Sequence, residues 1–125
     1  MTRARLGLAL LLAAAAGPLH AATFTDRGTA VLQSLDKVTA RTSILKVPVG
    51  ETQGFGTIAV TVRACRVTPP EEPPESAAFV EVTDTRTDAA TVPAGPLFSG
   101  WMFASSPALS ALEHPVYDVW VLGCE

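Results

Sequence analysis

The strongest constraint on the fold of this chain is a regular alternation of side chains between Thr57 and Val67. One face of this segment is apolar, and the other face carries Arg63 and Cys65 among small residues. A period of two residues with a charged side chain on one face is typical of a half-buried β-strand. The segment therefore predicts such a strand over 57–67.

Further strand patterns lie in segments 43–49, 77–83, 97–104 and 116–122, and an extended stretch is expected to begin at Lys37. In 97–104, Trp101 and Phe103 share one face of the predicted strand, opposite Met102. Pro48 has no amide hydrogen to donate, so 43–49 is expected at the edge of a sheet or to end there.

A short helix is expected near 107–113. Ser106 and Pro107 form a helix-start signal, and His114 ends the helix because it precedes Pro115. We therefore expect an all-β fold, a small antiparallel barrel or sandwich of five to seven strands with this one helix. Segments 57–67 and 77–83 are expected to pair antiparallel.

The connection between these two strands, residues 68–75, reads Thr-Pro-Pro-Glu-Glu-Pro-Pro-Glu. Its four prolines favour an extended, stiff conformation. Such an acidic segment is either a docking loop or a solvated connector, and the connector is favoured. Residues 84–96 are expected to form a surface loop.

The N-terminus has the pattern of a secretory signal peptide. Arg3 and Arg5 precede an apolar run over 6–16, and small residues follow at Ala21 and Ala22. The run of 11 residues is shorter than the roughly 20 that a membrane-spanning helix needs, although an uncleaved anchor is the alternative. We expect 1–21 to be the signal, 22–34 a lead-in segment and 35–125 a single β domain, with the mature protein in the periplasm and without a transmembrane segment.

Cys65 and Cys124 are the only cysteines of the chain. Export would place them in an oxidising compartment, where an even number of cysteines usually pairs. A structural disulfide is therefore expected, and free thiols or an intermolecular bond are the alternatives. Closing this loop stabilises a domain by about 4 kcal/mol in the chain-entropy description.

The polar residues do not form a convincing catalytic constellation. Ser105, Ser106, His114 and Asp118 suggest a hydrolase, but the Gly-x-Ser-x-Gly elbow is absent. His114 and the nearby acids lack the spacing of metal ligands, and His114 is interpreted as a helix-end residue. We expect neither an enzyme nor a metal or other cofactor. The net charge of −3 argues against nucleic acid as a partner.

The aromatic residues of the C-terminal third have two interpretations. They are core residues by default, but Trp101 or Trp120 could instead lie on an outer face as a binding anchor. If the chain has a binding surface, the candidate residues lie in or near this block: Trp101, Phe103, Ser105, Ser106, His114, Tyr117 and Trp120.

From Leu35 onward the chain resembles the DUF2155 family of small exported proteins of unknown function, found mainly in alphaproteobacteria. The resemblance rests on the strings Leu-Asp-Lys-Val-Thr-Ala-Arg-Thr (35–42), Val-Pro-Val-Gly (47–50), Phe-Gly-Thr (55–57), Val-Arg-Ala-Cys (62–65) and Pro-Pro-Glu-Glu-Pro-Pro-Glu (69–75). Its longest block runs from Phe98 to Trp120. The resemblance implies export, one domain and no assigned activity, and it suggests an association with a respiratory complex of the inner membrane.

These observations predict a periplasmic, non-catalytic protein-interaction domain that binds an envelope protein through the block from Trp101 to Pro115. The suggested role is that of an accessory or assembly factor of an inner-membrane respiratory complex. The alternative is a cell-wall or polysaccharide-binding module that uses exposed aromatic residues. A small hydrolase using Ser105 or Ser106 with His114 is the third hypothesis.

Overall fold

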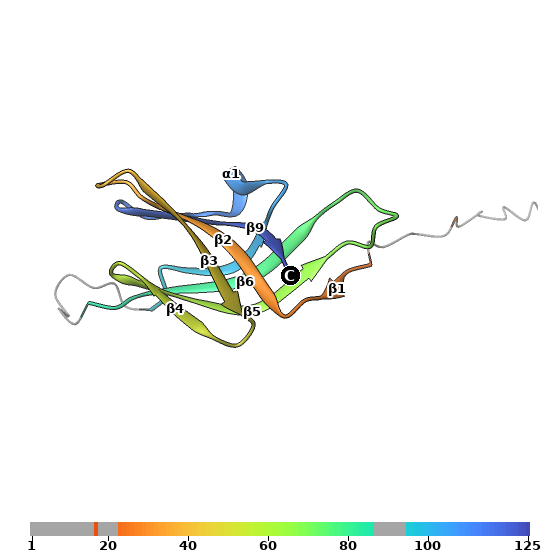
Figure 1. The fold of residues 1–125 in the computed structure, drawn as a ribbon, viewed down its shortest axis with the longest axis horizontal. Helices are drawn as coiled ribbons and strands as arrows, with labels where there is room; N and C mark the ends of the chain where they lie inside the picture. Colours follow the sequence, from red (N-terminus) through yellow and green to blue (C-terminus); the bar gives the residue numbers. More distant parts are fainter. Residues whose placement is uncertain (1–16, 18–22, 87–94) are drawn as a thin grey trace, which may run out of the picture.

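The computed structural model describes residue 17 and residues 23–86 and 95–125. Within these ranges, nine strands form two antiparallel sheets that pack face to face (Figure 1). One short helix is also present. The predicted all-β class is confirmed. The strand number exceeds the predicted five to seven because β1, β4 and β8 are too short to leave a pattern in the sequence.

Sheet A has the strand order β1-β5-β6-β7, and β4 pairs with one end of β5. Its strands are β1 (Thr25–Asp26), β4 (Thr52–Phe55), β5 (Ile58–Val67), β6 (Ser76–Asp84) and β7 (Phe98–Phe103). β5 and β6 form the predicted antiparallel pair, with a register shift between Val62 and Ala64.

Sheet B has the order β3-β2-β9-β8. Its strands are β2 (Thr29–Asp36), β3 (Arg41–Pro48), β8 (Leu112–Glu113) and β9 (Tyr117–Cys124). β3, which ends at Pro48, is the outermost strand of this order, as its proline predicts.

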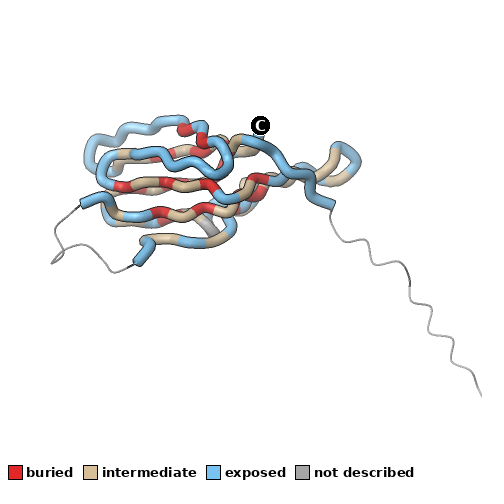
Figure 2. Tube along the Cα trace, turned by 90° about the horizontal axis from the view of Figure 1, so that it is seen from below, coloured by how far each residue is buried: buried red, intermediate tan, exposed pale blue. Residues whose placement is uncertain are grey.

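The core lies between the two sheets, and its buried residues recur with a period of two along much of each central strand. In β5 the register shift after Val62 interrupts this period. Buried residues alternate with more exposed ones along the central strands (Figure 2). Leu32 of sheet B and Ile58, Val60 and Val80 of sheet A are fully buried. Burial of these β-branched and Leu side chains is the main force that holds the two sheets together.

Two expectations about the first strands are wrong. Residues 29–34, assigned to the lead-in segment, belong to β2, which lies between β3 and β9 in sheet B. The stretch after Lys37 is not extended but turns between β2 and β3, where Asp36 Oδ1 accepts the Val38 and Thr39 amides at 2.9 and 3.2 Å. Ala40, at φ 55°, completes the turn.

The predicted disulfide between Cys65 and Cys124 is present, with a Cα–Cα distance of 5.8 Å. Cys65 is buried in β5 and Cys124 ends β9, so the bond joins sheet A to sheet B. The intramolecular bond therefore links two elements that no hydrogen-bonded ladder connects.

The helix α1 (Pro107–Ser110) begins where the sequence predicts but is shorter than the expected 107–113. Leu112 and Glu113 pair with β9 instead. Ser106 occupies the N-cap position without a side-chain capping hydrogen bond. The predicted signal peptide falls outside the described residues, as does most of the expected 84–96 loop. No helix within the described part of the chain is long and apolar enough to cross a membrane.

The connection between β5 and β6 is also more compact than predicted. The Glu72 amide donates to the Pro69 carbonyl at 3.1 Å, which closes a β-turn where the sequence predicts an extended segment. The loop extends beyond the end of sheet A (Figure 1).

Candidate functional site

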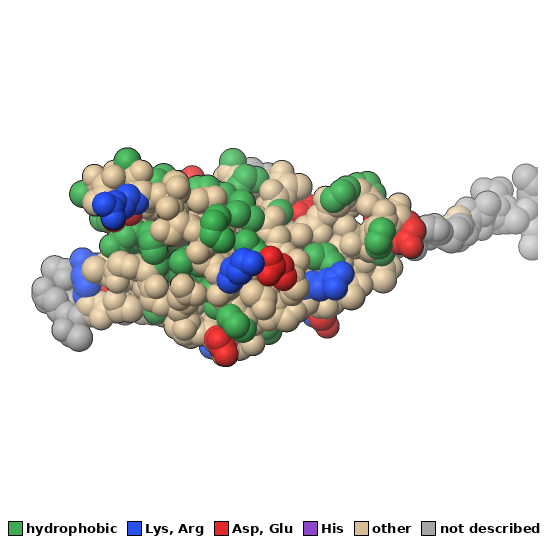
Figure 3. Space-filling model, in the orientation of Figure 1, with side chains coloured by type: hydrophobic (Ala, Val, Ile, Leu, Met, Phe, Trp, Pro, Cys, Tyr) green, Lys and Arg blue, Asp and Glu red, His purple; other side chains and the backbone are tan. Residues whose placement is uncertain are grey.

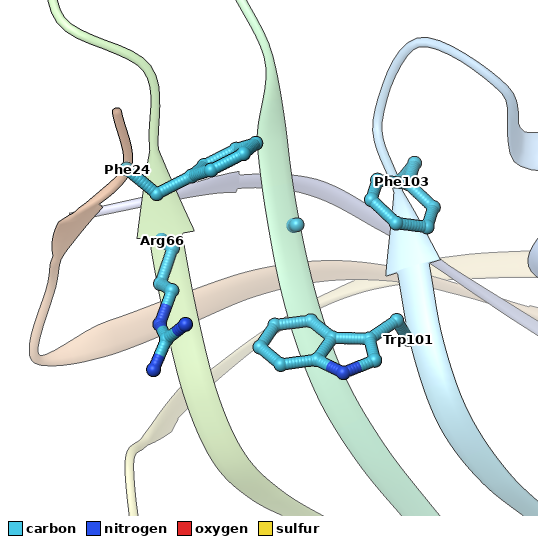
Figure 4. A pocket seen from close by; sticks show the side chains of 5 residues that line it. Phe24, Arg66, Trp101 and Phe103 are labelled. Atoms are coloured by element: carbon cyan, nitrogen blue, oxygen red, sulfur yellow. The ribbon is translucent and has the colours of Figure 1, made fainter. Parts of the chain in front are cut away.

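An apolar pocket on the outer face of sheet A is the candidate site (Figure 4). Trp101 and Phe103 alternate with the buried Met102, so both point away from the core, with 37% and 38% of their surface exposed. Their cavity has a volume of about 230 Å³. We call it the aromatic pocket, and it is lined by Phe24, Arg66, Ala77, Trp101 and Phe103.

Adjacent strands bring these residues together. In the ladder between β6 and β7, Phe103 lies opposite Ala77, and in the ladder between β5 and β6, Ala77 lies opposite Arg66. Ala77 is small and only 4% exposed, so it leaves room for the pocket between the larger side chains of the two neighbouring strands. Phe24 comes from the segment just before β1, which pairs with β5.

Arg66 and Trp101 are held in place from several sides. The Arg66 guanidinium lies 5.5 Å from the centre of the Trp101 ring, and its Nε donates to Asp26 Oδ1 at 2.8 Å. Trp101 also packs edge to face on Phe79, with ring centres 5.5 Å apart. Because these contacts restrict both side chains before any ligand binds, little conformational entropy remains to be lost on binding.

A second cavity, of about 280 Å³, shares Arg66 with the aromatic pocket. We call it the arginine pocket, and it also contains Arg27 and Arg63. Arg63 pairs with Glu81 and Arg66 pairs with Asp26. Among the described residues, no carboxylate lies within ion-pairing distance of Arg27. The pocket therefore has a local excess of positive charge in a chain whose net charge is −3.

The other predicted surface residues do not join Trp101 and Phe103. Tyr117 faces the core and is 7% exposed, so its place on the predicted binding surface is wrong. Its ring packs edge to face on Phe55 at 5.3 Å, and its hydroxyl accepts the Thr57 amide at 3.3 Å. Trp120 alternates with buried Val119 and Val121, so it lies on the outer face of sheet B.

His114 is not the helix-end residue that the sequence suggests, because α1 ends at Ser110. Its ring stacks on Tyr117, with ring centres 5.7 Å apart. Nδ1 accepts the Val116 amide at 3.1 Å, and the His114 carbonyl accepts Lys37 Nζ at 2.7 Å. These contacts hold His114 in a fixed position and stabilise the loop before β9.

Ser105 is bound to Glu75 at the base of the β5–β6 loop. Its amide and its hydroxyl both donate to the Glu75 carboxylate, which also accepts the Ser76 amide at 3.0 Å. Desolvation raises the pKa of Glu75, but the hydrogen bonds from Ser105 and Ser76 outweigh it, so the pKa lies below its ordinary value. Ser106 starts α1.

Acidic and basic side chains lie side by side on the face drawn in Figure 3, interspersed with exposed apolar ones. Within the described ranges, no group of three or more His, Cys, Asp or Glu side chains is placed to hold a metal ion. Sequence reasoning identified Trp101 and Phe103 but missed Phe24, Arg66 and Ala77. The shared face of Arg66 and its strand neighbours is visible only once the strand register is known.

Comparison with known proteins places the chain among uncharacterized relatives. The family described as "Uncharacterized protein conserved in bacteria (DUF2155)" matches residues 30–124, a range that contains every pocket residue named above except Phe24, Asp26 and Arg27. The uncharacterized protein RP359 of Rickettsia prowazekii (strain Madrid E) is 26% identical over 106 residues, which are 85% of this chain and 66% of that protein. The chain thus spans slightly less than two thirds of that relative's length. No solved structure matches.

Proposed function

This chain belongs to the DUF2155 family of uncharacterized bacterial proteins, and we propose that it is an exported, non-catalytic protein-interaction domain. The observation that carries the proposal is the aromatic pocket, where Trp101 and Phe103 remain more than a third exposed beside Arg66. Aromatic side chains and Arg are the residues that most often dominate the binding energy of protein interfaces.

The size of the pocket favours a protein ligand. Its volume of about 230 Å³ lies below the roughly 300–1,000 Å³ of pockets that enclose a drug-sized molecule. A cavity of this size suits one anchoring side chain of a partner. The surrounding polar groups, Arg66 and Asp26, would then form part of the rim.

We place the protein in the periplasm, which is an inference from two features. The first is the signal-peptide pattern over 1–21, and the second is the Cys65–Cys124 disulfide, since such bonds persist in oxidising compartments. Fractionation of cells that express the chain, followed by mass determination of its N-terminus, tests this location. Recovery of the protein in the cytoplasmic fraction, with its N-terminus still at Met1, would contradict this location.

A comparison of two tryptophan variants tests the interaction. Tagged wild-type protein, Trp101→Ala and Trp120→Ala would each be purified from gently solubilised envelopes, and co-purifying proteins identified by mass spectrometry. Trp120→Ala is the matched control because it removes the same ring from the other sheet. We expect wild type and Trp120→Ala to retain a partner that Trp101→Ala loses, and an inner-membrane respiratory complex is the partner we propose. Equal recovery with all three proteins would refute a role for the pocket.

A cell-wall or polysaccharide-binding role is the second candidate. It is favoured by the exposed Trp101 ring beside the hydrogen-bonding Arg66–Asp26 pair, because sugars bind through a flat apolar face and a polar edge. Co-sedimentation with purified peptidoglycan tests it. Retention that depends on Trp101 would support this role, and a protein that stays in the supernatant would remove it.

A further inference from the structure

We infer that the aromatic pocket and the arginine pocket together receive the turn between β5 and β6 of a second copy of this chain. This inference rests on the proposed binding role of the aromatic pocket and names its occupant. We call residues 69–75 the proline-rich loop. Its exposed tip combines a proline ring with carboxylates, which complements the apolar and the cationic lining of the two pockets.

The tip of the proline-rich loop is exposed and is closed by a backbone hydrogen bond. The hydrogen bond from the Glu72 amide to the Pro69 carbonyl, 3.1 Å long, puts Pro70 and Glu71 at the two central positions of a β-turn. Both residues are exposed. The proline ring fixes its own backbone angle, so the tip presents an apolar ring next to a carboxylate in a defined arrangement.

The base of the loop is held by side-chain hydrogen bonds. Thr68 Oγ1 donates to the Pro73 carbonyl and accepts the Glu75 amide, each at 2.9 Å. The Glu75 carboxylate is in turn fixed by Ser105. Because the loop is already ordered, docking it costs less conformational entropy than docking a flexible segment.

The loop cannot reach the pockets of its own chain. Arg66 and Ala77, which line the aromatic pocket, lie in the two strands that lead into the loop. The Thr68 amide donates to the Glu75 carbonyl at 3.0 Å, so the hairpin continues outward and its tip lies beyond the end of the sheet (Figure 1). An occupant of this kind must therefore come from another molecule.

The loop and the pockets are complementary in charge and in polarity. Glu71 and Glu72 give the tip a negative charge, and Arg27 gives the arginine pocket a cation without an ion-pair partner among the described residues. The Pro70 ring matches the apolar lining of the neighbouring aromatic pocket. Because Arg66 lines both cavities, the apolar and the acidic part of one turn can be bound side by side.

The arrangement favours a closed dimer. Pocket and loop lie at the same end of sheet A, so two copies can exchange loops about a two-fold axis, which satisfies both sites and leaves none for further growth. A contact made through one turn on each side is smaller than the interfaces of stable complexes. We therefore expect weak dimerisation that is visible at high protein concentration.

Sedimentation of the mature chain over a range of concentrations up to millimolar tests this inference. We expect the wild type to approach a dimer and to go no further. Glu71→Lys/Glu72→Lys and Arg27→Glu should each be monomeric, whereas an equal mixture of these two variants should recover the dimer, because each loop then meets a pocket of opposite charge. Glu113→Lys reverses the charge of an exposed residue of β8 that lines neither pocket, and this control should dimerise as the wild type does.

Trp101→Ala adds an arm that does not depend on charge. It should weaken the dimer by about tenfold or more, and its thermal unfolding will show whether the fold is intact. A wild type that stays monomeric throughout, or a dimer unaffected by both charge variants, would overturn the inference. If the wild type is monomeric but an envelope partner is still lost in Trp101→Ala, this inference fails while the proposed interaction domain stands.

Discussion

Trp101 and Tyr117 belong to one aromatic stretch of the sequence, yet they lie in opposite environments at the two ends of the molecule. Trp101 stands on the outer face of sheet A, beside a cavity and an arginine. Tyr117 fills the core and contacts Phe55 and His114. Closeness in sequence and shared residue type thus say little about role, because the adjoining strands decide which side of a sheet each ring occupies.

The two ends also differ in how closely they are packed. Gly56, at φ 56°, lies so near the Tyr117 hydroxyl that a Cβ at this position would overlap it. Gly100, next to Trp101, has its nearest such neighbour, Phe98, at 3.7 Å, an ordinary contact. The Tyr117 end has no space for an added methyl group, whereas the Trp101 end leaves an open surface, which agrees with the binding role that we propose for it.

The largest effect should come from the bond that joins the two sheets. Replacing both Cys65 and Cys124 by Ser should lower the free energy of unfolding by about 4 kcal/mol, because the unfolded chain regains the entropy of a 59-residue loop. Urea unfolding of the variant and of the wild type, with and without reductant, measures this. A variant as stable as the oxidised wild type would show that the bond contributes nothing.

Truncating the two rings tests the comparison directly. Tyr117→Ala should cost about 3 kcal/mol, since it leaves a cavity in the core. Trp101→Ala should cost less, about 1 kcal/mol, since the ring is already 37% exposed and its ring interactions are with Arg66 and Phe79. Denaturant unfolding of both variants gives the difference. Equal losses would mean that the Trp101 side is packed as tightly as the core.

Adding a single methyl group at each end tests the difference in packing between the two ends. Gly56→Ala should cost about 2 kcal/mol, because it combines the positive φ with the clash against Tyr117. Gly100→Ala is the matched control and should be neutral or slightly stabilising. The midpoints of thermal unfolding of the two variants measure the difference. If Gly100→Ala were destabilised and Gly56→Ala were not, the Trp101 end would be the more tightly packed one.

The smallest effect is a difference in acid sensitivity between the ends. Beside the Tyr117 end, hydrogen bonds from Arg86 lower the pKa of Asp84 to about 2 from 3.8; at the loop end, the pKa of Glu75 is lowered from 4.5. Since both folded-state values are depressed, the stability they contribute is present above the unfolded values and lost as the pH falls through the folded ones. Below pH 5, the free energy of unfolding should fall less steeply with decreasing pH in Asp84→Asn and in Glu75→Gln than in the wild type. The difference should appear at lower pH for Asp84→Asn. Unfolding curves measured from pH 5 to pH 2 test this prediction. A loss of stability in both variants that is as steep as in the wild type would contradict it.

The parts of the fold that a local pattern could reveal were predicted from the sequence. The alternation in β5 marked its buried face as far as Val62. The register shift beyond Val62 could not be seen in the sequence, so the prediction that Cys65 lies on the face of Arg63 is wrong, and Cys65 is buried in the core. The same period in β7 put Trp101 and Phe103 together on one side. β2 was missed because Val31, Leu32 and Leu35 also fit a helical spacing. In the structure, Leu32 faces the core while Val31 and Leu35 lie on the partly covered outer face of sheet B.

The turn after Asp36 was missed because Val38, Ala40 and Thr42 happen to alternate like a strand. Asp36 itself was the signal that could have revealed it, since Asp side chains often bind the amides two and three residues on. The pocket could be predicted only in part. Phe24 reaches it through the pairing of β1 with β5, a non-local contact that leaves no trace in either segment. Arg66 reaches it because the register of β5 with β6 sets it opposite Ala77.

The disulfide also determines how the molecule would respond to mechanical force. If the chain is pulled from its two ends, tension passes from Cys65 directly to Cys124, and the 59-residue loop between them carries no load. At roughly 3.3–3.6 Å per extended residue, the bond withholds about 200 Å of contour length. The strands inside this loop, β6 to β9, would therefore bear no tension. The strands before Cys65 would unfold first. Under such a load the chain would lengthen in two steps, and the second step would follow only after reduction of the bond.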